Sequence, residues 1–321
     1  MRLSVVIPCY NEEPGLAECV RQVQQVLAGI VASGRISADS NIWLVDDGSR
    51  DRTWEVIQSL ATEYPNVFGV KLSRNRGHQN ALLAGLNCAD GDAVVTIDAD
   101  LQDDIDVLPD MVDAYLAGNE VVYGVRRSRD QDSFFKRWPA RRYYALLRLL
   151  GVEIIPDHSD YRLLGREALR ALAEYPESNL FLRGLIPQLG FASTRIFYDR
   201  KVRLVGETKY SLGKIFGLGI DGVTSFSSVP LRMIAAFGAL VFLVTIVVGL
   251  WVVYVRLFTD HATPGWASIT LPIYALGGIQ LLSLGLVGEY VAKIYLETKR
   301  RPRFIIEKMT TDLMWRRRST D

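Results

Sequence analysis

Two long stretches without a charged side chain constrain the fold of this chain most strongly. Residues 233–255 form a run of 23 residues, and residues 262–288 a run of 27, that contain no Lys, Arg, Asp or Glu. A helix that spans a bilayer needs about 20 apolar residues, because each residue adds about 1.5 Å along the helix axis. We therefore expect a hairpin of two transmembrane helices within residues 232–292. The alternative is a pair of helices buried in a large soluble core.

Positive charge gathers in two segments of a chain whose formal net charge is only +1. Residues 126–150 contain eight Lys or Arg and two acidic residues, and residues 293–321 contain nine basic and four acidic residues. A basic segment beside a membrane span attracts anionic lipid head groups. We therefore expect an anionic bilayer as a partner, although a solvated helix face would also explain residues 126–150. Nucleic-acid binding is not expected, because it would leave the apolar stretches unexplained.

The distribution of basic residues also predicts the orientation in the membrane. Arg232 precedes the first stretch and several basic residues follow the second, whereas residues 257–292 contain no Lys or Arg. Basic residues remain on the cytoplasmic side, so we expect both termini and the first 210 residues there. The apolar part of residues 1–8 is too short for a signal peptide, and three cysteines without metal-type spacing are typical of reduced thiols.

The first part of the chain alternates between strand-like and helix-like patterns. Such alternation predicts an α/β domain with a mostly parallel sheet covered on both faces. Ligands of these sheets bind beyond the carboxyl ends of the strands. The expected strands are 3–7, 42–45, 67–72, 93–97 and 121–125, and the expected helices are 15–31, 52–64 and 79–89.

Two further segments have the composition of amphipathic helices that lie in the membrane interface. Residues 136–150 mix Trp, Tyr and Leu with arginines, and residues 211–231 are small and apolar with few charges. The predicted organisation is thus a cytoplasmic α/β domain (1–210), an interfacial helix (211–231), two transmembrane helices (232–292) and a basic cytoplasmic tail (293–321).

Acidic residues follow two of the expected strands. Asp98 and Asp100 are one residue apart, so both carboxylates can approach one divalent cation, and their hard oxygen ligands favour Mg²⁺ or Mn²⁺. Water and a diphosphate would complete the coordination. Acidic turns of this kind are also common as solvated loops. For Asp46 and Asp47, a contact with ribose or uracil and an ordinary turn fit equally well.

Taken together, three motifs are more specific. The segments 5–13 (VVIPCYNEE), 45–49 (VDDGS) and 98–103 (DADLQD) resemble the family 2 glycosyltransferases. Residues 72–78 (LSRNRGH) resemble the S-R-N-x-G loop of the branch that glycosylates polyprenyl phosphates, which includes the bactoprenol glucosyltransferases. Three more motifs extend the resemblance over nearly the whole chain: 159–164, 206–211 and 288–290. The resemblance implies a GT-A (Rossmann-like) fold, a nucleotide-sugar donor and inversion at the anomeric carbon.

The resemblance also implies a site, residue by residue. The residues implied to bind the nucleotide-sugar are Pro8, Tyr10, Glu12, Asp47, Ser73, Arg74 and Asp98. Asp98 and Asp100 would hold Mg²⁺ or Mn²⁺, and Arg126 and Lys209 would contact phosphate oxygens of donor or acceptor.

Asp160 stands where the family places its base. A phosphate monoester has a second pKa of about 6, so much of such an acceptor is already dianionic at pH 7. Asp160 would then either take a residual proton or orient the acceptor and stabilise a positive sugar carbon. The three histidines, His78, His158 and His261, are scattered, so we expect neither a zinc site nor a histidine base.

The resulting expectation is a metal-dependent enzyme of a bacterial-type inner membrane. It would transfer one hexose, glucose from UDP-glucose by resemblance, to undecaprenyl phosphate or a similar polyprenyl phosphate. A single transfer is favoured because the Q-x-x-R-W motif of processive synthases is absent. The alternatives are a mannose or aminoarabinose-type donor, a diacylglycerol or ceramide acceptor, and a non-catalytic membrane-anchored scaffold. Relatives suggest a homo-oligomer.

Overall fold

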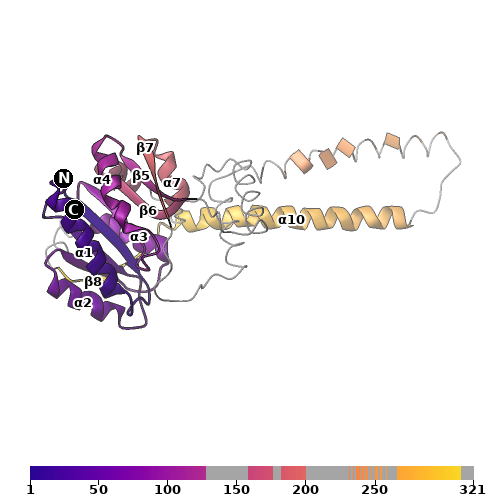
Figure 1. Ribbon diagram of the computed structural model, residues 1–321. Helices are drawn as coiled ribbons and strands as arrows, with labels where there is room; N and C mark the ends of the chain where they lie inside the picture. Colours follow the sequence, from indigo (N-terminus) through magenta and orange to yellow (C-terminus); the bar gives the residue numbers. More distant parts are fainter. Residues whose placement is uncertain are drawn as a thin grey trace. The chain divides into compact units, whose positions relative to one another are not determined.

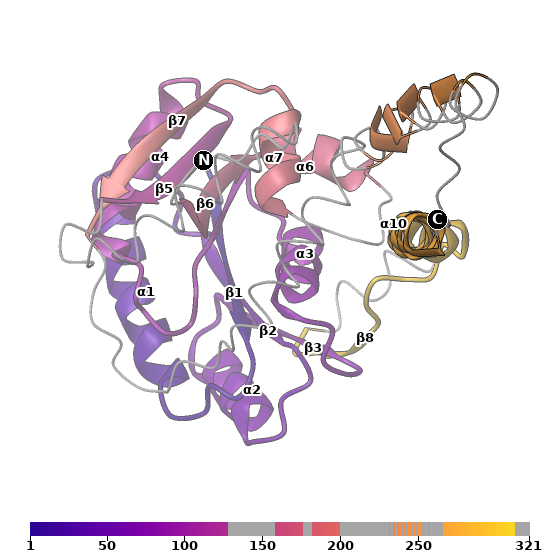
Figure 2. The same cartoon turned by 90° about the vertical axis from the view of Figure 1, so that its right-hand side faces the viewer.

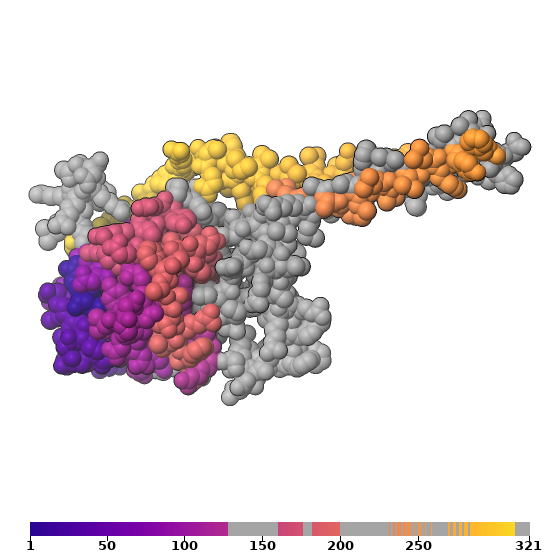
Figure 3. Space-filling model, turned by 90° about the horizontal axis from the view of Figure 1, so that it is seen from above, coloured from indigo at the N-terminus to yellow at the C-terminus, as the bar shows by residue number. Residues whose placement is uncertain are grey.

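A computed structural model describes residues 1–127, 158–175, 182–199 and 266–311, together with separate positions between 231 and 258. The described residues belong to two compact units. The α/β unit contains those up to residue 199 and residues 300–311, and the second unit contains the remainder. In the space-filling view, the part of the α/β unit coloured from indigo to red forms one continuous body (Figure 3).

Figure 1 shows the α/β unit with several of its strands labelled. The unit is built on one eight-stranded sheet with the order β7-β5-β6-β4-β1-β2-β3-β8. β6 and β8 run antiparallel to their neighbours, and every other pairing is parallel. The prediction of a mostly parallel α/β sheet is therefore confirmed. The strands are β1 (Leu3–Cys9), β2 (Asn41–Asp46), β3 (Val67–Leu72), β4 (Ala93–Thr96), β5 (Val121–Arg126), β6 (His158–Gly165), β7 (Ser193–Tyr198) and β8 (Ile306–Met309).

Helices cover both faces of the sheet (Figure 2). Successive side chains of a strand point to opposite faces, so Val5 and Ile7 of β1 join one core cluster and Val6 joins the other. The first face carries α1 (Leu16–Ala32), α2 (Thr53–Glu63) and α4 (Leu108–Leu116), the last preceded by the short helix η1 (Ile105–Val107). The second face carries α3 (His78–Cys88), α6 (Arg166–Ala173) and α7 (Leu182–Gln188).

All five expected strands and all three expected helices are present, with ends that shift by at most two residues. The sequence did not predict β6, β7, β8, α4, α6 or α7. The expected interfacial helices at 136–150 and 211–231 lie outside the described residues, apart from residue 231.

The second unit contains α10 (Trp266–Thr298), a helix of 33 residues that includes most of the second apolar stretch. Among the described residues, one segment, Ile279–Thr298, is long and apolar enough to cross a membrane, and none of it is buried. The first apolar stretch, 233–255, is described only at separate positions. The described part of the chain thus contains one candidate span, and the expected two-helix hairpin is not confirmed.

After α10 the chain returns to the sheet, which the sequence did not predict for the basic tail. β8 pairs with the outer edge of β3. The Gly69 N–H donates to Thr310 Oγ1 at 2.8 Å, and the Thr310 N–H donates to the Gly69 carbonyl at 3.0 Å. Further along, the Ser73 N–H donates to the carbonyl of Ile305 at 2.9 Å. β8 therefore covers an otherwise open sheet edge.

We predict that Gly69→Val lowers the free energy of unfolding of the α/β unit by about 1–3 kcal/mol. A Cβ at Gly69 would lie 2.4 Å from Ile57 Cγ2 on α2 and 2.9 Å from Thr310 Cγ2, so both neighbours would have to move. Thermal unfolding of the purified protein measures the change. Gly29→Ala is the matched control, because its Cβ meets nothing within 4 Å inside α1. Equal midpoints for the two variants would contradict close packing at Gly69.

Candidate functional site

The acidic motifs meet at one edge of the sheet. β1, β2 and β4 are parallel, so the loops that follow them lie together. β6 runs antiparallel to β4, with Arg162 opposite Thr96, so Asp160 in the first half of β6 also lies at this edge. The hydroxyl of Thr96 donates to the main-chain carbonyl of Asp160.

Asp47 holds two loops together. Its carboxylate accepts the N–H groups of Arg76 at 2.7 Å and of Gly77 at 2.9 Å. Burial raises the pKa of this carboxyl, and the two backbone donors partly offset the rise. Gly48 has a positive φ of 65°, and a Cβ there would lie 2.5 Å from the backbone nitrogen of Asn75. The predicted nucleotide ligand Asp47 thus shapes the neighbouring loop.

The preceding residue, Asp46, has a different environment. One carboxylate oxygen, Oδ1, accepts the N–H of Ser49 at 2.9 Å. The other, Oδ2, is buried and has no hydrogen-bond partner among the described residues. Buried polar atoms in native proteins are nearly always paired, so this oxygen is a candidate to accept a hydrogen bond from a ligand. The sequence pattern gave no reason to prefer Asp46 over Asp47.

The loop that carries Asp98 and Asp100 is strained. Leu101 has a φ of 51°, a left-handed conformation that is costly for a leucine and is found mainly at functional sites. The Gln102 N–H donates to Asp100 Oδ1 at 3.2 Å. Burial, together with the charges of Asp103, Asp160 and Asp100, raises the pKa of Asp98 to about 6, and His78 acts in the opposite direction.

This acidic loop fits a divalent cation that keeps part of its coordination for water or a ligand. Among the described residues, no group of three or more His, Cys, Asp or Glu could hold a metal ion by itself. Asp98 and Asp100 supply two carboxylates, and mutual repulsion is one cause of the raised pKa of Asp98. Mg²⁺ is commonly bound by one or two carboxylates plus phosphate oxygens of the substrate.

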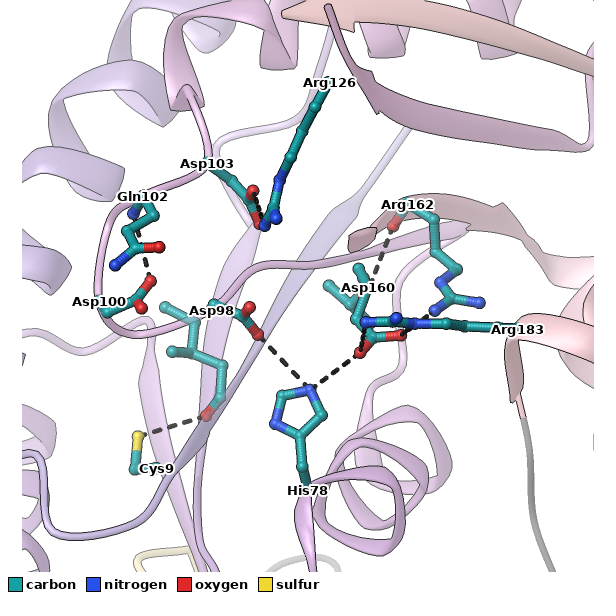
Figure 4. A network of polar contacts seen from close by, with 12 residues as sticks. Cys9, His78, Asp98, Asp100, Gln102, Asp103, Arg126, Asp160, Arg162 and Arg183 are labelled. Carbon is teal, nitrogen blue, oxygen red and sulfur yellow. Dashed lines mark hydrogen bonds and ion pairs between the residues drawn. The ribbon is translucent and has the colours of Figure 1, made fainter. Parts of the chain in front are cut away.

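Three side chains surround the carboxylate of Asp160, which is buried (Figure 4). Arg183 donates from Nε to Oδ1 at 3.2 Å and from Nη2 to Oδ2 at 3.0 Å. Arg162 donates to Oδ1, and His78 Nε2 lies 3.3 Å from Oδ2. Burial alone would raise the pKa of Asp160, but His78, Arg162 and Arg183 outweigh it and hold the pKa well below its usual range.

His78 joins Asp160 to the acidic loop. Its Nε2 also lies 3.5 Å from Asp98 Oδ1 (Figure 4). Burial opposes protonation of the imidazole, but the hydrogen bond to Asp160 and the charges of both carboxylates raise the pKa of His78 overall. The sequence analysis did not include His78 among the site residues, and the structure places it between Asp98 and Asp160. The signal that could have found it is its position just beyond β3, at the start of α3.

Arg126, predicted to bind phosphate, is anchored by an ion pair. Its Nη2 lies 3.1 Å from Asp103 Oδ1, and its Nε donates to the hydroxyl of Tyr198 at 3.3 Å. The Tyr198 hydroxyl in turn donates to Asp103. Burial alone would lower the pKa of Arg126, but Asp103 and Tyr198 outweigh this effect and raise the pKa overall. Arg126 therefore fixes the end of the acidic loop against β5 and β7.

The remaining residues that were predicted to bind substrate differ in their exposure to solvent. Tyr10 is exposed, and Pro8 is buried within β1. The N–H of Glu12 donates to Thr53 Oγ1 at 2.9 Å. Ser73 and Arg74 are exposed on the loop that Asp47 holds, whereas Lys209 lies outside the described residues.

Comparison with known proteins identifies the family of this chain. The family model described as glycosyl transferase family 2 matches residues 4–173. The chain belongs to this family. It is 45% identical over 307 residues to the uncharacterized glycosyltransferase YkoT of Bacillus subtilis, covering 95% of this chain and 91% of that protein.

Two further relatives have more specific names. The prophage bactoprenol glucosyl transferase homolog of Escherichia coli is 34% identical, with 96% of this chain and 99% of that protein covered. The bactoprenol glucosyl transferase of Shigella phage SfII is 35% identical, with 96% of this chain and 98% of that protein covered. Among solved structures, glucosyl-3-phosphoglycerate synthase of Mycobacterium tuberculosis, crystallised with Mn²⁺ and UDP, has a TM-score of 0.44 at 20% identity and covers 70% of this chain and 76% of that one.

We predict that Asp98→Asn stabilises the metal-free protein above pH 6 relative to wild type. The folded state raises the pKa of Asp98 from its ordinary value of 3.8 to about 6, so the folded protein retains a proton that the unfolded chain has lost. The stability of the wild type therefore falls as pH rises through this window. Unfolding in chelator at several pH values measures the difference, with Asp110→Asn, at an exposed position of α4, as a surface control. A stability difference that does not grow between pH 4 and pH 6 would contradict the raised pKa.

Proposed function

We propose that this protein transfers one hexose from a nucleotide-sugar to the phosphate of a polyprenyl phosphate, with inversion at the anomeric carbon. The single observation that carries the proposal is the convergence of Asp98 and Asp160 on His78 at the carboxyl edge of the sheet. Similarity over 96% of the chain to proteins named bactoprenol glucosyl transferases supports a polyprenyl acceptor and glucose as the hexose. UDP-glucose is the proposed donor.

On the donor side, Asp98 and Asp100 would hold Mg²⁺ or Mn²⁺, which when bound neutralises charge on a diphosphate leaving group. Oδ2 of Asp46, which has no partner among the described residues, would accept a hydrogen bond from the nucleotide. The exposed side chains of Ser73 and Arg74 would donate to the nucleotide. Asp47 acts by holding the loop that presents Arg74.

On the acceptor side, the nucleophile needs positioning and charge compensation more than deprotonation, because a phosphate monoester is already largely ionised at pH 7. The lowered pKa of Asp160 supports the same conclusion, since a carboxylate held by two arginines and a histidine is a weak base. Of its two possible roles, we therefore infer that Asp160 orients the acceptor and stabilises positive charge at the sugar carbon. Lys209 would contribute to binding of phosphate.

The lipid acceptor requires the enzyme to work at a membrane. We propose a multi-pass protein of a bacterial inner membrane, with the α/β unit and both termini in the cytoplasm. α10 would supply one span and residues 233–255 the other. The interfacial helices and the basic segments would contact anionic lipids, and the protein would assemble as a homo-oligomer.

Transfer of label from nucleotide-sugar to lipid tests the proposed function directly. Membranes that contain the protein are incubated with labelled UDP-glucose and undecaprenyl phosphate, and the organic phase is analysed for labelled lipid. Parallel reactions with GDP-mannose, with an aminoarabinose-type donor, and with diacylglycerol or ceramide as acceptor distinguish the alternatives. Binding of nucleotide-sugar without transfer to any lipid would support a non-catalytic scaffold and overturn the proposal.

Asp100→Asn is expected to lower metal-dependent turnover at least about hundredfold, because removing a ligand weakens the neutralisation of the leaving group by several kcal/mol. The readouts are turnover against Mg²⁺ concentration and, independently of activity, Mn²⁺ affinity by calorimetry. Asp110→Asn, an exposed carboxylate on α4, serves as the control. Full activity of Asp100→Asn at saturating Mg²⁺ would exclude Asp100 as a metal ligand.

Asp160→Asn is expected to lower turnover about 10²–10⁴-fold and to leave nucleotide-sugar affinity within about threefold of wild type. The reason is that a neutral amide no longer orients Arg183 and His78 or stabilises positive charge. Because the substitution also leaves Arg162 without its buried anion, thermal unfolding and the charge-conserving variant Asp160→Glu accompany the assay. Equal losses in turnover and in nucleotide affinity would assign Asp160 to donor binding instead.

A further inference from the structure

Arg183 occupies a fixed position at the start of α7. The N–H of the preceding residue, Leu182, donates to Gln79 Oε1 on α3 at 3.0 Å. The carbonyl of Leu182 accepts from Nη1 of Arg162 on β6 at 3.4 Å. Because both main-chain groups of Leu182 are held, the backbone of Arg183 is positioned relative to Asp160 and His78 by contacts other than its own side chain.

The two arginines that bind Asp160 differ in exposure. The side chain of Arg162 is 2% exposed and that of Arg183 is 42% exposed, although both contact a carboxylate that is itself 7% exposed. Arg162 is therefore the permanent partner that compensates the buried charge of Asp160. Since Arg162 already compensates that charge, Arg183 can exchange part of its contact with Asp160 for contact with a ligand, and no buried carboxylate is left without a cation.

The position of Arg183 also indicates which half of the site it serves. In Figure 4, Arg183 approaches Asp160 from the side opposite Asp100, with Asp98 and His78 between them. Asp98 and Asp100 form the donor end under the proposed function, so Arg183 lies at the acceptor end. The imidazole of His78 lies between the donor end and the acceptor end. Its Nε2 is 3.5 Å from Asp98 Oδ1 and 3.3 Å from Asp160 Oδ2.

We propose that Arg183 binds the phosphate monoester of the acceptor beside Asp160. The inference rests on the proposed function and adds a substrate-binding residue to it. A guanidinium presents several N–H donors in a planar fork that matches phosphate oxygens in a bidentate arrangement. Asp160 then orients the guanidinium of Arg183. Arg183 in turn holds the nucleophilic phosphate next to the sugar carbon of the donor, which binds at Asp98 and Asp100.

The test measures Michaelis constants for both substrates in the full-length protein, with acceptor concentration varied as its mole fraction in detergent micelles. Arg183→Ala is expected to raise KM for polyprenyl phosphate about 10- to 100-fold, the loss typical of a charge-assisted hydrogen bond. KM for the nucleotide-sugar is expected to change less than about threefold. Arg183→Lys keeps the positive charge but lacks the planar guanidinium. Its KM for polyprenyl phosphate is expected to lie between those of wild type and Arg183→Ala. Arg170→Ala is the matched control, because Arg170 is an exposed arginine of α6 paired with Glu167.

A pair of soluble probes separates phosphate recognition from recognition of the lipid chain. Farnesyl phosphate is expected to inhibit wild type and to lose most of its inhibition in Arg183→Ala, whereas the neutral farnesol acts equally on both. A raised KM for the nucleotide-sugar with an unchanged acceptor KM would place Arg183 at the donor diphosphate and overturn the inference. A fall in kcat alone, with both KM values unchanged, would reduce Arg183 to a support for Asp160 and would also overturn it.

The proposed function and the inference fail in different ways. If wild type transfers no sugar to any polyprenyl phosphate, the proposed function is wrong and the inference fails with it. If wild type transfers sugar and Arg183→Ala keeps the acceptor KM and the farnesyl phosphate inhibition of wild type, only the inference is wrong.

Discussion

A carboxylate buried in a β-sheet needs a permanent positive partner, and Arg162 provides it for Asp160 two residues along the same strand. Removing Asp160 would leave Arg162 as an uncompensated charge in a low-dielectric interior, which costs several kcal/mol. β6, which carries this pair, lies between β4 and β5 and so is paired on both sides within the sheet. The side chains of His78 and Arg183 and the backbone of Leu182 are all held by contacts to the pair, so the geometry of the site depends on it.

The same pair explains why charged side chains gather on the second face of the sheet, at the proposed acceptor end of the site. α3, α6 and α7 pack together on this face around one apolar cluster. α3 presents His78 and α7 presents Arg183 at the point where β6 exposes the edge of Asp160. Charged groups from three elements are tolerated there because the carboxylate of Asp160 pairs with the cations around it. This concentration of charge is compatible with the proposed reaction between two phosphorylated substrates.

The sequence predicted the strands whose signal is local and missed those whose signal is not. β1, β2 and β4 are runs of β-branched or apolar residues that end in polar loops. β6 contains Asp160 and Arg162, so it reads as polar although both side chains are buried against each other. β8 is four residues long, and its partner β3 lies more than two hundred residues earlier in the chain. A pairing of that kind leaves no periodicity for a sequence pattern to reveal.

A sequence motif also conceals which of its residues touch a ligand and which build the loop. The aspartates 46 and 47 are adjacent and chemically identical, yet backbone donors satisfy Asp47 while Asp46 keeps a buried oxygen without a described partner. Gly48 is required because any side chain there would collide with the backbone of Asn75. Asp47 and Gly48 of this motif are therefore explained by packing between the loops that follow β2 and β3. Only the three-dimensional contacts separate that constraint from recognition, since both favour the same residues at the same spacing.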